Sequence, residues 1–252
     1  MHKFFAKTIF IGKNVIFLTE CHSTNTELSK LVKKSSLQTG TVVMADYQSA
    51  GKGQRANSWS SERGMNILSS ILLRPSFLAI DKQFFLNILF GLAISDAIGH
   101  FIASGVKIKW PNDVYVHDHK IAGVLIEASW LRNKIDYAIC GLGVNVNQTN
   151  FASLKATSLF LETGIPQNRG EVIELILMSL EKWNQLLQKR DYEHLLTAYH
   201  ERLYWKDDLH LFKIDEQLIE GRIKGINPIG QLRVLIDGSE QTFDLKGLVF
   251  VA

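Results

Sequence analysis

The sequence predicts an α+β fold, with a mixed, largely antiparallel sheet flanked by helices and a small barrel-like β unit at the C-terminal end. Strand-length and helix-length segments interleave over residues 1–204, but several neighbouring strands are joined by turns too short for a helical crossover. Beyond Trp205, short alternating strands are separated by turn residues, including the hairpin signal Asp237-Gly238. We therefore predict two domains, over residues 1–204 and 205–252.

Four helices are expected from local signals. Thr24 followed by Glu27 fits a capping box, which predicts a helix from Thr24 to about Lys34. Residues 84–102 are apolar on nearly every face, which predicts a buried helix. Apolar residues at helical spacing predict two more helices, over residues 171–189 and 192–203.

Short apolar runs supply the strands. The turn at Trp110–Asp113 and the polar turn at His117–Lys120 separate runs that are close enough in sequence to pair as hairpins. In the main domain we expect strands over residues 15–18, 41–46, 66–73, 106–109, 114–116, 121–129 and 137–141. In the C-terminal unit we expect four, over residues 209–214, 218–226, 231–236 and 241–245.

Composition excludes several classes of protein. The 28 basic residues against 25 acidic ones give a net charge of +3, which suits an anionic ligand or an acidic partner but lacks the dense basic stripe of a nucleic-acid-binding protein. Cys21 and Cys140 form no CxxC motif, so we expect reduced thiols and neither a disulfide framework nor a zinc site. The N-terminus lacks the apolar core of a signal peptide, and no apolar run reaches the ~20 residues that span a bilayer. We expect a soluble, cytoplasmic protein with no membrane partner.

The loop from Tyr47 to Trp59 carries the strongest local pattern. Glycines at 51 and 53 flank Lys52, and Arg55 follows. Glycine lets backbone N–H groups approach a ligand, and basic side chains suit phosphate or carboxylate oxygens. Such a short motif alone fits a solvated connection equally well. The spacing is not that of a P-loop, so ATP would have to be held in another way.

Further polar clusters lie at strand ends, turns and a helix start. Taken singly, each has a plain structural explanation as a cap, an exposed turn lysine or loop punctuation. Together they suggest a site for a bulky anionic ligand. His117 and His119 are neighbours without a third ligand nearby, so we interpret them as solvated surface and expect no protein metal site. The clusters are Ser23-Thr24-Asn25, Lys109 to Asp113, Lys120 with Ala122-Gly123, and Gly141 to Asn147.

In order and spacing these clusters resemble one family, the biotin–protein ligases. The matching segments are Ser23–Asn25, Gln48–Arg55 with Trp59, Lys109–Asp113, Lys120–Glu127 and Gly141–Asn145. The resemblance runs from about residue 15 to residue 150, and KWPND followed by KxAG is highly specific. It implies the catalytic fold of the biotin and lipoate ligases, which is similar to that of class II synthetases, over residues 1–204, and an SH3-like barrel over residues 205–252.

The resemblance implies a two-step reaction. Biotin and ATP give biotinyl-5′-adenylate, and the biotinyl group then passes to a lysine of a biotin carboxyl carrier protein or domain, as in acetyl-CoA carboxylase. Mg²⁺ would neutralise the departing pyrophosphate. The implied catalytic residues are Lys120, Lys52 and Arg55. The implied biotin-binding residues are Ser23, Thr24, Asn25, Gln48, Gly51, Lys52, Gly53, Trp59, Lys120 and Gly123. The implied ATP or adenylate contacts are Lys52, Gln54, Arg55, Trp59, Asn112, Asp113, Lys120 and Asn145.

Two departures from the family pattern bear on function. The family's glycine loop often reads GRGRRG, whereas here Lys52 and Gln54 replace the first two arginines and Ala56 replaces the last glycine. Since Gln54 removes a positive charge, we expect weaker retention of the adenylate. Fewer than ~20 residues precede the match, too few for the helix-turn-helix domain of some relatives. We therefore expect no DNA-binding function, while a homodimer stays open.

Two other functions compete with this hypothesis. A lipoate–protein ligase or octanoyltransferase shares the fold and the transfer to a carrier lysine, but the KWPND segment and the basic loop as written argue against it. A non-catalytic module that senses biotin or nucleic acid is the second, because Trp59 in a basic loop could stack on a base.

Overall fold

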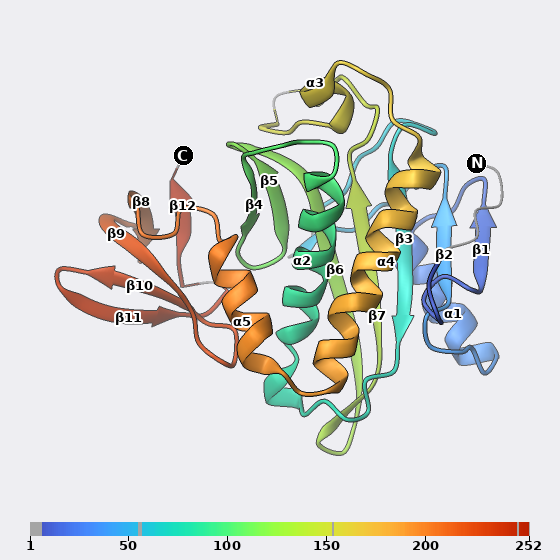
Figure 1. The fold of residues 1–252 in the computed structure, drawn as a ribbon, viewed down its shortest axis with the longest axis horizontal. Coiled ribbons are helices and arrows are strands. Elements are labelled where there is room, and N and C mark those ends of the chain that lie inside the picture. Colours follow the sequence, from blue (N-terminus) through green and yellow to red (C-terminus); the bar gives the residue numbers. More distant parts are fainter. Residues whose placement is uncertain (1–6, 55–56, 153, 246, 252) are drawn as a thin grey trace.

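A seven-stranded sheet forms the centre of the protein, in the order β1-β2-β3-β7-β6-β5-β4 (Figure 1). The computed structural model describes residues 7–54, 57–152, 154–245 and 247–251. Among the described strands of this sheet, β1 and β2 are parallel and every other neighbouring pair is antiparallel, which confirms the predicted mixed, largely antiparallel sheet. The strands are β1 (Val15–Leu18), β2 (Val42–Ala45), β3 (Ile67–Leu73), β4 (Val106–Lys109), β5 (Asp113–Val116), β6 (His119–Leu131) and β7 (Lys134–Val144).

Helices lie on both faces of the sheet. The buried helix α2 (Phe85–Gly99) and α4 (Arg169–Gln188) cover one face, as Figure 1 shows, and α1 (Thr24–Lys34) packs on the other through Leu28. Further helical segments in the described residues are the short α3 (Leu159–Thr163), α5 (Tyr192–Glu201) and a 3₁₀ turn at Ile80–Lys82. Among the described helices, none combines the length and apolar character needed to cross a membrane.

Strand β3 is buried on both faces, which explains why its sequence is almost continuously apolar. Ile71 and Leu73 join the core under α2 and α4, while Leu72 packs against α1. Because side chains alternate along a strand, Ser70 shares the α1 face with Leu72. It is also paired in register with Gly141 of β7. The α1 face of β3 and β7 is where the candidate site lies.

The C-terminal segment forms a second, five-stranded antiparallel sheet in the order β11-β10-β9-β8-β12. Asp237 and Gly238, with φ of 48° and 77°, make the predicted two-residue hairpin turn between β10 and β11. The four expected strands are present, and a three-residue fifth strand was missed. The strands are β8 (Leu209–Ile214), β9 (Gln217–Ile226), β10 (Leu232–Ile236), β11 (Ser239–Phe243) and β12 (Val249–Val251).

Hydrogen bonds between described residues join this sheet to the main body. The indole Nε1 of Trp110 donates to the carbonyl oxygen of Gly230 over 2.9 Å. The backbone N–H of Ile226 donates to His200 Nε2 over 3.0 Å, and burial lowers the pKa of His200. The domain division between residues 204 and 205 stays a prediction.

Two details of the sequence analysis were wrong. Helix α1 has the expected bounds, but Ser23 is its N-cap and makes no side-chain capping bond. The Thr24–Glu27 capping box is absent because Glu27 instead pairs with Lys30 over 2.8 Å and the Thr24 hydroxyl is engaged elsewhere. Lys120 was expected in a turn, whereas it lies inside β6, next to the start of the strand.

Candidate active site

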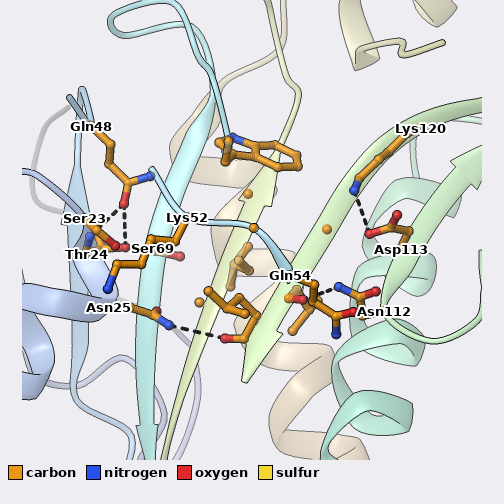
Figure 2. Close-up of a pocket in the computed structure, with 18 residues that line it drawn as sticks. Ser23, Thr24, Asn25, Gln48, Lys52, Gln54, Ser69, Asn112, Asp113 and Lys120 are labelled. Atoms are coloured by element: carbon orange, nitrogen blue, oxygen red, sulfur yellow. Dashed lines mark hydrogen bonds and ion pairs between the residues drawn. The ribbon is translucent and has the colours of Figure 1, made fainter. Parts of the chain in front are cut away.

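A cavity of about 50 Å³ lies on the α1 face of the sheet, between the start of α1, the loop after β2, and strands β3, β5, β6 and β7 (Figure 2). Small-molecule sites usually enclose ~300 Å³ or more, so the described conformation is a contracted one. Lining residues that the sequence analysis proposed are Ser23, Thr24, Asn25, Gln48, Lys52, Gly53, Gln54, Trp59, Asn112, Asp113, Lys120 and Gly123.

Two proposed site residues are described but do not line the cavity, and a third, Arg55, cannot be placed. Gly51 is not on the cavity wall, but its carbonyl oxygen accepts from the backbone N–H of Trp59 over 2.9 Å. A Cβ on Gly51 would lie 2.3 Å from the Trp59 carbonyl oxygen, so glycine is required where the two backbone segments of the loop come together. Asn145 is buried, does not line the cavity, and donates to the Thr157 carbonyl oxygen over 2.9 Å. Arg55 lies outside the described residues.

Polar side chains line the wall next to α1. Gln48 Oε1 accepts from the backbone N–H of Thr24 over 2.7 Å and from its hydroxyl over 3.1 Å. With its oxygen held there, the Gln48 amide nitrogen is left to donate to a ligand. Ser70 Oγ lies 2.7 Å from Thr24 Oγ1 and 2.6 Å from Asn25 Oδ1, and Asn25 Nδ2 donates to Glu127 Oε2 over 2.7 Å. These bonds fix the Thr24 and Asn25 side chains before any ligand binds.

The floor of the cavity consists of glycines on β7. A Cβ on Gly141 would lie 2.4 Å from Asn25 Oδ1, and one on Gly143 would lie 2.3 Å from the Trp59 indole. Glycine inside a strand commonly marks such a close approach. The sequence analysis included both glycines in a polar cluster of the predicted site but did not name them among the binding residues. Four further lining residues were not named as site residues. Val124, Leu125 and Leu142 lie within the segments that resemble the biotin–protein ligases, whereas Ser69 lies in a buried apolar strand without a functional signal.

Lys120 and Asp113 lie opposite this polar wall, across the cavity from Gln48 and Thr24 (Figure 2). Lys120 Nζ is 2.7 Å from Asp113 Oδ1 and 5.5 Å from the centre of the Trp59 ring. Both charged side chains are partly exposed to the cavity. The structure thus brings Lys120 and the described part of the glycine loop to one cavity.

Backbone bonds on both sides hold the start of β6 in place. Asn112 donates through Nδ2 to the Val124 carbonyl oxygen over 2.5 Å, and its own carbonyl oxygen accepts from the Val124 N–H over 2.9 Å. On the other side, the Lys120 N–H donates to the Lys155 carbonyl oxygen, and the Lys120 carbonyl oxygen accepts from the Thr157 N–H. The Lys109–Asp113 turn therefore fixes the register of the strand that carries Lys120.

Lys109 itself does not line the cavity. Its Nζ lies 4.6 Å from the Tyr115 ring centre and 4.9 Å from that of Phe250, next to the C-terminal sheet. Burial lowers the pKa of Lys109 and raises the pKa of Tyr115 to about 12. The lysine of the KWPND segment thus contacts the C-terminal unit rather than the cavity.

The indole nitrogen of Trp59 is a candidate hydrogen-bond donor to a ligand. Its Nε1 is buried and has no hydrogen-bond acceptor among the described residues. A buried unpaired N–H costs about 1–3 kcal/mol, so a ligand acceptor placed there would be favoured.

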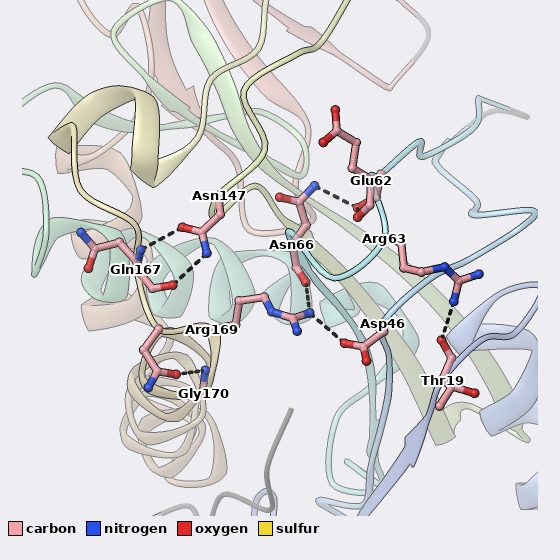
Figure 3. Close-up of polar contacts among 11 residues, drawn as sticks. Thr19, Asp46, Glu62, Arg63, Asn66, Asn147, Gln167, Arg169 and Gly170 are labelled. Atoms are coloured by element: carbon pink, nitrogen blue, oxygen red, sulfur yellow. Dashed lines mark hydrogen bonds and ion pairs between the residues drawn. The ribbon is translucent and has the colours of Figure 1, made fainter.

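The base of the loop is held by a polar network shown in Figure 3. Arg169 Nη1 lies 2.9 Å from Asp46 Oδ1 and donates to the Asn66 carbonyl oxygen over 3.3 Å. Asn66 also accepts from the Val146 N–H over 2.9 Å. Because Asp46 precedes the loop and Asn66 follows it, both ends of the loop are tied to the start of α4 and the end of β7.

A family profile described as "Biotin/lipoate A/B protein ligase family" matches residues 18–145, which include the α1 start, the glycine loop, Lys120 and the β7 glycines. The chain belongs to this family.

Relatives of the biotin/lipoate ligase family agree with the match. The "Bifunctional ligase/repressor BirA" of Bacillus subtilis (strain 168) is 33% identical over 185 residues, which cover 71% of this chain and 56% of the relative. The "Biotin--[acetyl-CoA-carboxylase] ligase" of Paracoccus denitrificans is 30% identical over 190 residues, covering 72% of this chain and 78% of the relative. The chain thus spans little more than half the length of the Bacillus relative.

A solved structure of the same family has the same architecture. The biotin protein ligase from Aquifex aeolicus in complex with biotin and ATP superimposes with a TM-score of 0.80 at 26% identity. The superposition covers 95% of this chain and 99% of the Aquifex chain, so it includes the C-terminal sheet.

Proposed function

We propose that this protein is an ATP-dependent biotin–protein ligase, which forms biotinyl-5′-adenylate and transfers the biotinyl group to a lysine of a biotin carboxyl carrier domain. The observation that carries the proposal is the single cavity that places Lys120 and Lys52 beside a prearranged wall of amide and hydroxyl groups. The names of the Paracoccus and Aquifex relatives support biotin and ATP as its substrates.

In the first step, a carboxylate oxygen of biotin attacks the α-phosphorus of ATP, the bond to the β-phosphate breaks, and pyrophosphate leaves. Both reactants are anionic, so cations must screen their approach and the charge of the transition state. Lys120 is proposed to stand between the carboxylate and the α-phosphate, with Asp113 holding its ammonium in position. Lys52 is proposed to bind phosphate and carboxylate oxygens together with Arg55, whose side chain lies outside the described residues.

The wall next to α1 is proposed to bind the ureido ring of biotin. A urea needs both donors and acceptors, which Ser23, Thr24, Asn25 and the free Gln48 amide nitrogen can supply. The glycines Gly51, Gly53 and Gly123 are proposed to let the backbone approach the acid, while Trp59 covers it. On the adenylate side we propose Lys52, Gln54, Arg55, Trp59, Asn112, Asp113 and Lys120, with Asn145 acting through the segment that holds Lys120.

Mg²⁺ fits this site as an ion carried by the nucleotide. The described residues contain no group of three or more metal-ligating side chains, and Mg²⁺ commonly uses one carboxylate plus substrate phosphates. Asp113 is the carboxylate that lines the cavity in the described part of the chain, so it is the candidate ligand. When bound, Mg²⁺ supplies neutralisation of phosphate charge.

In the second step, the neutral amine of the acceptor lysine attacks the acyl carbon of the adenylate, and AMP leaves. The mixed anhydride must be kept from water between the two steps. Since the cavity is contracted, the ligands must displace the loop or Trp59 on entry, and reclosure over the adenylate would exclude solvent.

Incubation with ATP, Mg²⁺, labelled biotin and a carrier domain, with and without its target lysine, tests the proposal. Label should enter only the carrier that has the lysine, and lipoate or octanoate should not release pyrophosphate. Lys120→Ala should slow pyrophosphate release by about 10²–10³-fold, because a preorganised charge at the transition state is lost. Lys107→Ala, at an exposed lysine of β4, is the matched control and should retain the wild-type rate. Release of pyrophosphate with lipoate but not with biotin would refute the proposal.

Further proposals concern the catalytic domain, the location, the partners and the oligomeric state of the protein. We propose that catalysis belongs to residues 1–204, that the protein acts in the cytoplasm on a carrier domain, and that it has no DNA-binding role. Whether it forms a homodimer can be decided by light scattering coupled to size-exclusion chromatography.

A further inference from the structure

A second concavity, here called the side groove, lies beside the candidate active site. It has a volume of about 310 Å³ and runs between Lys30 and Lys33 of α1 and Glu127, Ser129, Tyr137 and Ile139 of β6 and β7. Asn25 and Lys52 line both the side groove and the active-site cavity. A molecule bound in the side groove would therefore adjoin the reacting groups.

The side groove is cationic. Lys30, Lys33 and Lys52 lie along it against the single carboxylate Glu127. In the described part of the chain, Lys33 and Lys52 have no ion pair, whereas Lys30 pairs with Glu27. The Glu127 carboxylate is already engaged by Asn25 over 2.7 Å. Glu27 and Glu127 offset two of the three lysine charges, so the groove carries a net positive charge, and Lys33 and Lys52 are its lysines without an ion pair in the described part of the chain.

The opposite wall of the side groove is less polar. Tyr137 and Ile139 of β7 form part of it, and the guanidinium of Arg74 lies 5.7 Å from the Tyr137 ring centre. Exposed lysines opposite an aromatic and aliphatic wall do not enclose a small anion tightly. They suit an extended polypeptide that carries carboxylates and apolar side chains.

An acceptor for this enzyme faces an electrostatic difficulty. Its target lysine is positively charged in water, and it must approach a cavity that holds Lys52 and Lys120. Like charges repel over ~8–10 Å at ordinary salt concentrations, which slows association. Carboxylates close to the target lysine would offset that repulsion if the ligase offered cations for them outside the cavity. The side groove offers such cations.

We propose that the side groove is the docking surface for the acceptor polypeptide, and that it selects an acidic segment next to the target lysine. The inference rests on the proposed ligase function. Beyond that function, the inference specifies the charge of the acceptor segment and the path by which the acceptor reaches the adenylate.

Lys33→Glu tests the proposal, with Lys34→Glu as its control. Lys34 is an exposed lysine at the same end of α1 but does not line the groove, so both variants change the net charge equally. The measurements are kcat/KM for transfer from preformed adenylate to an isolated biotin carboxyl carrier domain at low and high salt, and pyrophosphate release without carrier. Lys33→Glu should lower the transfer kcat/KM about tenfold at low salt and much less at high salt, whereas Lys34→Glu should stay within about twofold of wild type.

Several outcomes would overturn the proposal. Equal losses in the two variants, or a loss in Lys33→Glu that does not depend on salt, would show that the groove is not the docking surface. Slower pyrophosphate release in Lys33→Glu would assign the groove to nucleotide binding instead. Direct titration of the carrier domain into the adenylate-free protein separates this inference from the proposed function, because binding weakened only in Lys33→Glu would support docking even if no adenylate formed.

Discussion

The guanidinium of Arg169, at the start of α4, lies 2.9 Å from the carboxylate of Asp46, at the end of β2. The same nitrogen donates to the carbonyl oxygen of Asn66 on the far side of the glycine loop. Arg169 is therefore a positioning residue for a loop that it does not belong to.

Arg169→Met should loosen the loop without touching the ligands. Asp46 would be left as a partly buried carboxylate without its cation, so the free energy of unfolding should fall by about 1–3 kcal/mol. The KM for biotin should rise and adenylate should be released faster, while kcat changes less. Chemical denaturation, steady-state kinetics and a filter-binding release assay would measure these effects.

Arg233→Met is the comparison for Arg169. Arg233 pairs with Glu240 at the exposed surface of the C-terminal sheet, so its loss should change the free energy of unfolding little. If the two variants release adenylate at the same rate, Arg169 does not position the loop.

Gln54→Arg should slow adenylate release. Gln54 lines the cavity as a neutral side chain, and an arginine there would add a charge-assisted contact to the phosphate. The rate of biotinyl-adenylate release from wild type and variant, measured after a gel-filtration step, tests this prediction. Unchanged release would count against a role for position 54 in retention.

Gly143→Ala should disturb the floor of the cavity. Its Cβ would meet the Trp59 indole at 2.3 Å, so the ring must move and biotin affinity should fall by about tenfold or more. Gly99→Ala is the control, because a Cβ at that helical position meets nothing within 4 Å and alanine favours a helix. Calorimetric titration with biotin would measure the affinities, and equal affinities would contradict the proposed site.

Stability should decline on acidification through His200. Burial lowers the folded-state pKa of His200 below its ordinary value of 6.5, so the unfolded state binds the proton more readily. The stabilisation is present above about pH 6.5 and is lost as the pH falls toward the folded-state pKa. Protonation would also remove the acceptor for the Ile226 N–H, which joins α5 to the C-terminal sheet.

Denaturant unfolding of wild type and His200→Gln between pH 7 and 5 would measure this dependence. The variant should be less stable at pH 7 and should lose less stability on acidification. His210 also has a pKa lowered by burial and should contribute equally to both proteins. Parallel pH dependences would exclude His200 as the titrating group.

The sheet and most helices could be predicted because their apolar patterns have clear periods and clear ends. Strand β7 was predicted too short, at residues 137–141, since Gly141 and Gly143 read as a loop. In the structure the strand continues through both glycines to Val144. Strand β12 was missed because three residues are too few to show a period.

Site residues that lie in a recognisable motif could be proposed from the sequence. Residues that reach the site only through tertiary contacts could not. Ser70 lies within a buried apolar strand, and only the packing of α1 on β3 brings its hydroxyl to Thr24 and Asn25. The capping box at Thr24 failed for the same reason, because Gln48, distant in sequence, takes the Thr24 hydroxyl. Local sequence cannot show such competition between partners.

The bond from the Trp110 indole to the Gly230 carbonyl oxygen has a consequence for experiments with shortened forms of the chain. Trp110 opens the turn that ends at Asp113, the partner of Lys120. Deleting the C-terminal strands would leave the buried indole N–H of Trp110 without its acceptor, a few residues from the Asp113–Lys120 pair. A shortened chain that has lost activity would therefore not reveal whether those strands recognise anything, because their removal also disturbs the geometry of the chemistry itself.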